Sequence, residues 1–380
     1  MSRYDVIVAG LGAMGSAAAC HLARRGARVL GLDRFAPPHA SGSSSGKSRI
    51  IREAYFEHPA YVPLVQRAYE LWRALERDSG RELLRETGGL MIGPPDGALV
   101  SGALLSARTH ALPHEILDAA ELRKRHPALR PEADVVAVWE PRAGVLFPEA
   151  CIAAHLDQAA RAGATFRSDE PVLAWRAADG GVEVTTAAAL HRASKLLIAA
   201  GSWAARLLPE LQLPLTVRRQ VLFWFEPAAR AEQFAPERFP VFIWEDEPGR
   251  FFYGFPDLGE GVKIARHQEG EESDPDRVRR EVAASEAAPI RAVLERLIPD
   301  APGRLRESAV CLYTNTPDSH FILDFHPAHP EVLIASPCSG HGFKFAGVLG
   351  EAMADLLLGG RPRFDLGLFR LGRFKTRVER

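Results

Sequence analysis

A lysine and a histidine stand four residues apart in the segment GVKIARHQ, at Lys263 and His267. Side chains alternate between the two faces of a strand, so both would lie on one face with Ala265 between them. Two basic groups on one face could form the cationic wall of a binding pocket. The same pattern fits a face exposed to water, and these residues alone do not decide between the two.

Three further cations occupy positions where an anionic ligand could bind. Lys344, in SGHGFKF, stands near the start of a predicted helix, where a positive charge does not help the helix itself. It would either bind an anion or extend to solvent. Arg49 and Arg52, in SRIIRE at an expected entry into a helix, could clamp a carboxylate through paired hydrogen bonds, although surface arginines are common. Tyr253, in FFYGFP, is by itself interpreted as a core residue.

A single cysteine, Cys311, lies in SAVCLYTNTPDSHFILD, and it could be either an inert core residue or a reactive tether. The other cysteines, Cys20, Cys151 and Cys338, are far apart, with no CxxC pair and no histidine cluster at metal-ligand spacing. A disulfide framework or a metal site is therefore not expected, and the cytoplasm is the expected compartment.

The glycines Gly10, Gly12 and Gly15 form a GxGxxG motif between a predicted strand and a predicted helix, and a second predicted strand ends at Asp33. The first glycine allows a tight turn, the second lets a pyrophosphate approach the backbone, and the third lets helix and strand pack closely. The helix N-terminus attracts the phosphates, and the acidic residue can bind ribose hydroxyls. This order of strand, glycine motif, helix and second strand predicts a dinucleotide site, but it does not distinguish FAD from NAD.

The elements that must position these residues fall into two groups. The motif predicts a parallel sheet, and 182–208 and 331–360 are expected to return to it. The segments QVLFWFE, VFIWEDE, RFFYGFP and GVKIARHQ instead alternate like antiparallel strands. A Ser/Gly-rich loop after Asp33 is expected to cover the cofactor, and apolar periodicity predicts a helix over 61–77. The basic run at Arg218–Gln220 is expected to be a solvated strand end.

Composition excludes several classes of protein. The 380 residues include 47 Lys+Arg and 48 Asp+Glu, a net charge of −1, so no global basic field indicates a nucleic-acid or membrane partner. No apolar run approaches the roughly 18 residues of a membrane-spanning helix. The N-terminus enters a predicted strand without a signal segment. An ordinary globular enzyme is expected.

Taken together, these segments resemble the monomeric sarcosine oxidase family of FAD-dependent amine oxidases, which includes N-methyltryptophan oxidase and pipecolate oxidase. The resemblance covers nearly the whole chain in order: GLGAMG with Asp33, SGSSSGKSRIIREAY, FYGFP followed by VKIARH, CLYTNTPDSHFILD, and SGHGFKF. It implies an α/β (α+β) fold in which a Rossmann-like FAD-binding domain is interleaved with an antiparallel-sheet substrate domain. The expected boundaries are 1–82 with 145–216 and 316–380 for the first, and 83–144 with 217–315 for the second.

The resemblance also implies roles for individual residues. Cys311 would hold FAD through a thioether to its 8α-methyl group. Arg52 and Lys344 would bind a substrate carboxylate, and Tyr253 and His267 would line the substrate pocket over one face of the flavin. Lys263, with Arg49 and Ser48, would lie near the opposite face, where oxygen is reduced. The full set of cofactor-binding residues implied in this way is Cys311, Gly10, Gly12, Ala13, Met14, Gly15, Asp33, Arg34, Ser43, Ser48, Arg49, Ile50, Val172, Ala200, Gly201, Trp203, Gly340, Gly342, Phe343 and Lys344.

The expected function is therefore oxidation of a secondary amino acid, such as sarcosine, by a monomeric cytoplasmic enzyme that reduces O2 to hydrogen peroxide. A cyclic or glycated amino acid as substrate, an acceptor other than oxygen, a non-catalytic flavoprotein and an NAD-dependent dehydrogenase are the alternatives. The chain departs from the family at Ser44 and Ser45, where His-His is common, and at Ser48 and Glu53. Glu53 could alter the charge around the carboxylate clamp, so these departures concern substrate identity.

Overall fold

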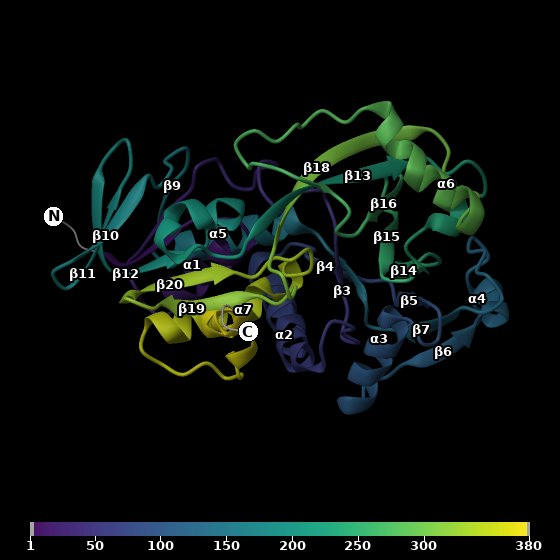
Figure 1. Ribbon diagram of the computed structural model, residues 1–380, viewed down its shortest axis with the longest axis horizontal. Coiled ribbons are helices and arrows are strands. Elements are labelled where there is room, and N and C mark those ends of the chain that lie inside the picture. The colour runs from purple at the N-terminus through teal and green to yellow at the C-terminus, as the bar shows by residue number, and fades with distance from the viewer. Residues whose placement is uncertain (1–3, 378–380) are drawn as a thin grey trace.

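The computed structural model describes residues 4–377, and Figure 1 shows its two large sheets at opposite ends of the molecule. The eight-stranded sheet contains a parallel core in which β12 and β2 flank β1. Its strands are β1 (Tyr4–Ala9), β2 (Val29–Leu32), β9 (Thr165–Arg167), β10 (Ala174–Ala178), β11 (Gly181–Thr185), β12 (Leu190–Ile198), β19 (Ile322–His326) and β20 (His329–Ser336).

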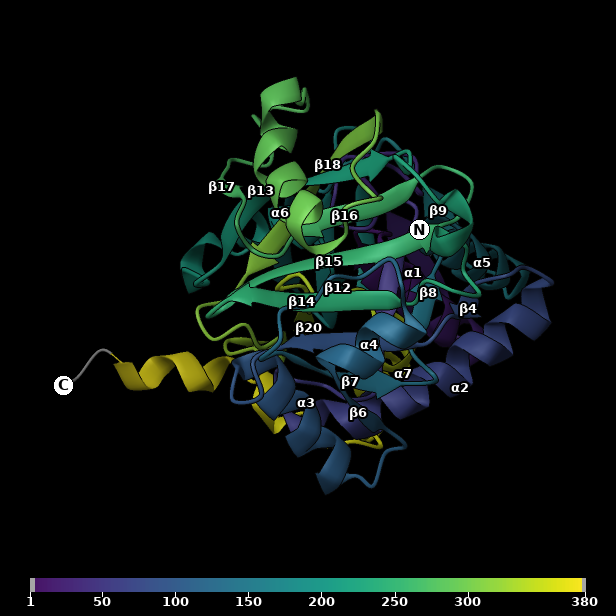
Figure 2. The same cartoon turned by 90° about the vertical axis from the view of Figure 1, so that its right-hand side faces the viewer.

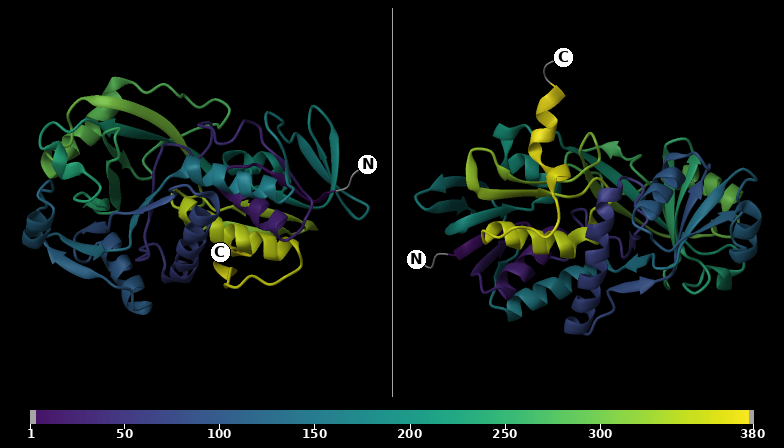
Figure 3. Two further views of the ribbon diagram at one scale, coloured as in Figure 1. Left: turned by 180° about the vertical axis from the view of Figure 1, so that it is seen from behind. Right: turned by 90° about the horizontal axis from the view of Figure 1, so that it is seen from below.

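Both faces of the parallel core of this sheet are buried, which explains why β1 is continuously apolar from Val6 to Ala9. Val6 and Val8 pack into the core beneath the helices, whereas Ile7 and Ala9 face a second core on the other side of the sheet. Helix α1 (Ala13–Arg24) packs against α5 (Pro148–Arg161) and α7 (Ala346–Leu357), and α2 (Val62–Ser79) joins this layer, which the view from below displays (Figure 3). The helix predicted over 61–77 is thus present as α2.

The nine-stranded sheet is mostly antiparallel, and β14, β15 and β16 lie side by side in Figure 2. Its aromatic and β-branched side chains form a separate core with α6 (Ala288–Leu297). Its strands are β5 (Gly89–Gly93), β6 (Glu115–Asp118), β7 (Val136–Glu140), β13 (Thr216–Phe225), β14 (Val241–Glu247), β15 (Arg250–Asp257), β16 (Val262–Arg266), β17 (Glu271–Glu272) and β18 (Leu305–Asn315). The fold-class prediction is therefore confirmed.

A small sheet joins the two halves through β3 (Arg49–Ile51), β4 (Leu84–Glu86) and β8 (Gly144–Leu146). Its strands come from segments assigned to both predicted domains, since β3 precedes the expected boundary at 82 and β4 follows it. This sheet does not test the boundaries at 82 and 144, and they stay a prediction. The remaining helices are α3 (Ala98–Thr109), α4 (Ala119–Arg125) and the short 3-10 helices η1 (Pro59–Tyr61), η2 (Gly201–Leu207), η3 (Pro209–Leu211), η4 (Ala231–Phe234), η5 (Ala284–Ala287), η6 (Phe343–Phe345), η7 (Gly367–Phe369) and η8 (Leu371–Arg377). Between residues 4 and 377, no helix has the length and apolar character needed to cross a membrane.

Candidate active site

A cavity of about 510 Å³ lies where the two large sheets meet. The first sheet contributes the carboxyl ends of parallel strands, at Ala9, Leu32 and Ser336, and the second contributes Ile243 and Tyr253. Ligands of open α/β sheets bind outside the carboxyl ends of the strands, so the cavity occupies the position at which a dinucleotide is expected.

The glycine-rich turn fits a dinucleotide. Gly10 has a φ of 95°, and a Cβ added there would lie 2.5 Å from the carbonyl oxygen of Ala199. A Cβ on Gly15 would lie 1.7 Å from the carbonyl oxygen of Gly10. Gly12 is the N-cap of α1 and has no side chain to cap it; the Ala13 N–H contacts Ser44 Oγ at 3.4 Å, which leaves other N–H groups of the first turn available to phosphate. Asp33 accepts the Leu11 N–H at 2.6 Å, and its carboxylate retains lone pairs for ribose hydroxyls.

Unpaired polar atoms around the cavity also indicate a polar ligand. In the part of the chain that the structure describes, Ser43 Oγ, Arg52 Nε and Ser336 Oγ are buried without a hydrogen-bond partner, and all three residues line the cavity. Buried polar groups are rarely left unpaired in native proteins. The residues present therefore fit a dinucleotide with a polar ring system.

Most of the predicted residues come together in this cavity. Those that line it are Gly10, Gly12, Ala13, Met14, Asp33, Arg34, Ser43, Arg49, Ile50, Arg52, Val172, Ala200, Gly201, Trp203, Tyr253, His267, Gly340, Gly342, Phe343 and Lys344. Four predicted residues lie outside its lining. Gly15 packs behind the turn, Cys311 lies behind the wall, and Ser48 and Lys263 line a neighbouring cavity.

Arg52 is a buried cation, only 2 % exposed, and it is paired with Glu57. Its Nη2 donates to both carboxylate oxygens, at 2.9 and 2.7 Å, and its guanidinium lies over the rings of Tyr55 and Phe56. Burial alone would raise the pKa of Glu57, but Arg52 overcomes this and holds it at about 2. The carboxylate of Glu57 therefore occupies Arg52 as a competing anion.

Lys344 is buried as well, and it does not extend to solvent. Its Nζ donates to the carbonyl oxygen of His341 at 2.8 Å and to the Tyr55 hydroxyl at 3.4 Å. Burial, with the nearby charge of Arg52, lowers the pKa of Lys344 to about 7. An incoming carboxylate would favour the charged form.

Neutral aromatic groups form another part of the wall. Burial lowers the pKa of His267 to about 4 and raises the pKa of Tyr253, so neither carries charge near pH 7. The Tyr313 hydroxyl lies 3.5 Å from His267 Nδ1. These groups can enclose a neutral amine and hydrogen-bond it without attracting its protonated form.

Lys263 faces a second cavity of about 140 Å³. Its Nζ donates to the carbonyl oxygens of Gly46 and Ser48, at 2.7 and 2.8 Å, and to Ser48 Oγ at 3.0 Å. The ammonium also lies 4.6 Å from the ring centre of Phe255, a residue that lines both cavities. Burial lowers the pKa of Lys263. The structure thus separates Lys263 from Tyr253 and His267.

Cys311 lies on β18 directly behind Ser43 and Arg49. Its thiol donates weakly to the carbonyl oxygen of Ser43 at 3.5 Å, and Arg49 Nη2 lies 3.3 Å from Sγ. Burial raises the pKa of the thiol, and the positive charge of Arg49 opposes this increase. A nearby cation favours the reactive thiolate.

Two expectations about basic residues were wrong. Arg218–Gln220 is not a solvated strand end: it lies inside β13, where Arg219 and Gln220 are buried between paired strands. Arg49 does not stand at a helix entry but begins the short strand β3, and Arg52 follows it. In both places, pairing with distant strands decides the local structure.

Several residues of the site were not found from the sequence. Glu57 pairs with Arg52, and Glu140 accepts the N–H groups of Glu53 and Ala54 at 2.6 and 2.8 Å. Glu57 follows Arg52 by five residues, and this short separation was the available signal for the ion pair. Nothing in the sequence links Glu140 to residue 53. The side chain of Glu53 pairs with Arg142 at 2.9 Å instead of facing the cavity.

Comparisons with known proteins agree with this geometry. The family model described as FAD dependent oxidoreductase matches residues 5–356. The chain is 48% identical to a monomeric sarcosine oxidase of Streptomyces avermitilis over 370 residues, covering 96% of each protein. It is 38% identical to an N-methyl-L-tryptophan oxidase of Salmonella heidelberg, covering 98% of this chain and 99% of that protein. The solved structure of NikD, an amino acid oxidase, superposes with a TM-score of 0.85 at 26% identity, covering 97% of this chain and 98% of that one.

Proposed function

The chain belongs to the FAD dependent oxidoreductase family, and from that premise we propose that it is an oxidase of secondary amino acids, with sarcosine or another N-methyl amino acid as substrate. The observation that carries this proposal is the pair of buried cations, Arg52 and Lys344, on the wall of a cavity that also contains the dinucleotide turn. Two buried cations next to one another are costly unless an anion binds between them. Glu57 supplies that anion to Arg52 in the free protein, and the carboxylate of an amino acid would replace it.

Carboxylate binding requires a change of partner at Arg52. The substrate carboxylate must displace Glu57 from Arg52 and reach Lys344, because the fixed guanidinium already pairs with Glu57 in the cavity wall. Guanidinium groups suit this exchange because their planar donors bind carboxylates in pairs. We expect the displaced Glu57 to move away from the bound substrate.

The amine end of the substrate would lie against Tyr253 and His267. Since these groups are neutral near pH 7, they would orient the deprotonated amine, which is the form that can be oxidised. FAD, when bound, would accept a hydride from a carbon next to the nitrogen and pass two electrons to O2, giving hydrogen peroxide. Hydrolysis of the resulting imine would give glycine and formaldehyde from sarcosine.

We assign Lys263 to the oxygen side of the site. It lines a cavity separate from the proposed amine pocket, and its ammonium is held by three oxygen atoms in a fixed position. In its protonated form, which burial disfavours, Lys263 would stabilise the negative charge that develops on dioxygen as it is reduced. Arg49, between this region and Cys311, would add to that field.

We also propose that Cys311 holds FAD through a thioether. The support is that Cys311 Sγ lies within 3.5 Å of polar atoms of Ser43 and Arg49, two residues that line the cavity. We further propose that the protein acts as a monomer in the cytoplasm with small molecules as its only partners. Among the described residues, the large exposed apolar side chains are Leu105, Ile116, Leu173, Leu190 and Leu358, and Leu105, Ile116 and Leu358 lie on or next to different elements.

Peroxide release from matched amines tests the proposal. We expect turnover with sarcosine, N-methyl-L-alanine or L-pipecolate, and none with dimethylamine, which lacks the carboxylate. Bleaching of the flavin by substrate without peroxide in air would contradict an oxidase and indicate another electron acceptor. No bleaching with any amine would contradict amine oxidation altogether.

Replacement of Arg52 by methionine tests the carboxylate clamp. We expect the KM for a carboxylate substrate to rise by about thirtyfold or more, since loss of one partner of a buried charged pair costs ~2–5 kcal/mol. The flavin spectrum should change little. Arg77, an exposed arginine of α2, provides the control, and Arg77→Met should leave KM unchanged. An unchanged KM in Arg52→Met would show that the carboxylate binds elsewhere.

A further inference from the structure

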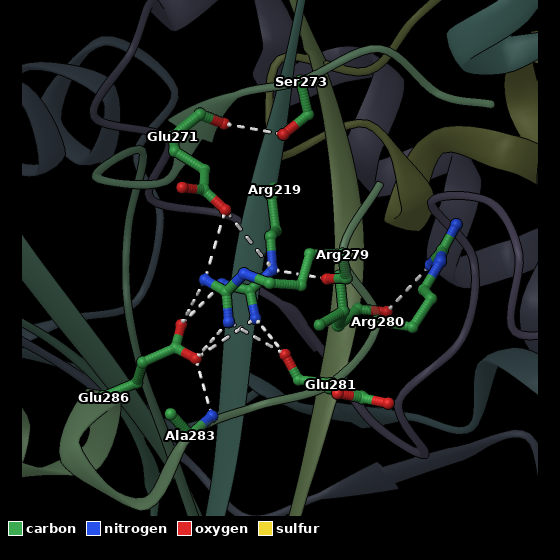
Figure 4. A network of polar contacts seen from close by, with 9 residues as sticks. Arg219, Glu271, Ser273, Arg279, Arg280, Glu281, Ala283 and Glu286 are labelled. Carbon is green, nitrogen blue, oxygen red and sulfur yellow. Dashed lines mark hydrogen bonds and ion pairs between the residues drawn. The ribbon is translucent and has the colours of Figure 1, made fainter. Parts of the chain in front are cut away.

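Residues 267–283, between β16 and η5, form a segment rich in charged side chains, which we call the charged segment. Figure 4 shows the contacts that tie it to β13 around Arg219, Arg279 and Glu286. It also reaches the cofactor cavity, since Asp276 pairs with Arg34 at 2.7 Å and accepts the indole N–H of Trp203 at 2.7 Å. Both of these partners line the cavity.

Arg219 fixes the backbone of the charged segment on both sides of residue 280. Its guanidinium is buried, and it donates to the carbonyl oxygens of Arg279 at 2.7 Å and Glu281 at 2.9 Å (Figure 4). Glu286 accepts from Arg219 at 2.6 Å and from Arg279 at 2.8 Å. Three charged groups thus hold a part of the chain that has little apolar core of its own.

Arg280, between these two anchored carbonyls, binds the loop that covers the cofactor cavity. Its Nη2 donates to the carbonyl oxygen of Ser41 at 2.5 Å, and its Nη1 lies 3.2 Å from that of Ala40. The same Nη1 lies 3.4 Å from the carbonyl oxygen of Val310, the residue before Cys311. Arg280 therefore ties the loop to the strand that carries the cysteine.

The next residues of that loop contact Cys311 and its neighbour. The N–H of Leu312 donates to the carbonyl oxygen of Gly42 at 3.3 Å, and the Cys311 thiol approaches the carbonyl oxygen of Ser43 at 3.5 Å. Ser43 lines the cavity and Cys311 lies behind it. Residues 40–43 therefore lie against the part of β18 that carries Cys311.

We propose that Arg280 is a positioning residue for covalent flavin attachment: it holds the loop at 40–43 against β18 so that the Cys311 sulfur meets the flavin methyl group. This inference rests on the proposed thioether at Cys311. In the net reaction the S–H bond and one C–H bond of the methyl group break and a sulfur–carbon bond forms. The two hydrogens leave with two electrons to O2 as hydrogen peroxide, so thiol, methyl group and O2 balance thioether and peroxide.

The rate of covalent attachment tests this role. Full-length protein produced under flavin limitation is mixed with FAD in air, and acid-precipitable flavin is followed with time. We expect Arg280→Ala to slow attachment about tenfold or more, because it removes charge-assisted hydrogen bonds. Arg280→Lys, which keeps the charge and some donors, should recover part of the rate. Thermal stability should stay close to that of the wild type, since Arg280 is exposed.

Arg277→Ala is the matched control. Arg277 is an exposed arginine of the same segment, and within the described residues its side chain makes no hydrogen bond or ion pair, so attachment should proceed at the wild-type rate. Equal attachment rates in wild type and Arg280→Ala, or equal slowing in Arg277→Ala and Arg280→Ala, would overturn the role of Arg280. Neither outcome would overturn the thioether. Wild-type protein that never retains flavin after acid precipitation would overturn the thioether itself.

Discussion

Two buried cations in the wall of the cavity have different partners. Arg52 holds Glu57 through two hydrogen bonds, whereas Lys344 is bound by neutral oxygens from His341 and Tyr55. Arg52 stays protonated at any physiological pH, but Lys344, with a pKa near 7, does not. The two cations should therefore contribute differently to binding as pH changes.

The dissociation constant of a carboxylate inhibitor should rise with pH because of Lys344. Its pKa in the free protein is lowered to about 7, so the side chain is mostly protonated below pH 7 and mostly neutral above it. Binding above pH 7 must protonate the lysine again, which weakens binding by up to about tenfold per pH unit. Spectral titration with methoxyacetate from pH 6 to 9 measures this. Lys344→Met should bind more weakly at pH 6 and lose the dependence; an unchanged dependence would assign it to another group.

At the scale of elements, the turn between β3 and η1 presents Arg52 and Phe56 to the cavity. Glu140, at the end of β7, holds this turn by accepting the N–H groups of both Glu53 and Ala54. Burial raises the pKa of Glu140 to about 7, although these two hydrogen bonds and the charge of Arg52 favour ionisation and Glu53 opposes it. A carboxylate serves both N–H groups, whereas an amide can accept only at its oxygen.

Glu140→Gln should therefore change how stability depends on pH. Between pH 4.5 and about 7 the folded protein keeps the proton on Glu140 while the unfolded chain releases it, so this group lowers stability as pH rises. The wild type should lose up to about 1.4 kcal/mol per pH unit relative to the variant across this window. Denaturant unfolding of both proteins at pH 5 and pH 7 gives the difference. Parallel curves would mean that Glu140 is already ionised at pH 5.

The sequence predicted the elements whose signals are local. The glycine motif predicted the turn from β1 to α1, and alternation predicted β13 to β16, because period and turn chemistry act within a few residues. It did not predict that Arg219 is buried, since its partner Glu286 lies 67 residues further along the chain. Glu140 and residue 53 are 87 residues apart, so their contact also depends on the tertiary fold.

At the scale of the whole molecule, the cavity is built by segments from both large sheets. Strand ends of the first sheet supply the dinucleotide turn, and β15 and the residue after β16 supply Tyr253 and His267. A cofactor bound there contacts both halves only while the chain is folded. Its binding should therefore stabilise the folded state of the complete protein.

A covalent tether changes how that stabilisation depends on FAD concentration. In the wild type with FAD attached through Cys311, the flavin stays with the unfolded chain, so added FAD should leave the Tm unchanged. In a Cys311→Ala variant the flavin dissociates on unfolding, and each tenfold increase in free FAD adds about 1.4 kcal/mol. With an unfolding entropy of roughly 2.1 cal/mol/K per residue, this raises the Tm by about 2 °C per tenfold increase. Thermal unfolding at several FAD concentrations measures both proteins. A wild-type Tm that rises with FAD as steeply as that of the variant would show that the cofactor is exchangeable and that Cys311 does not hold it.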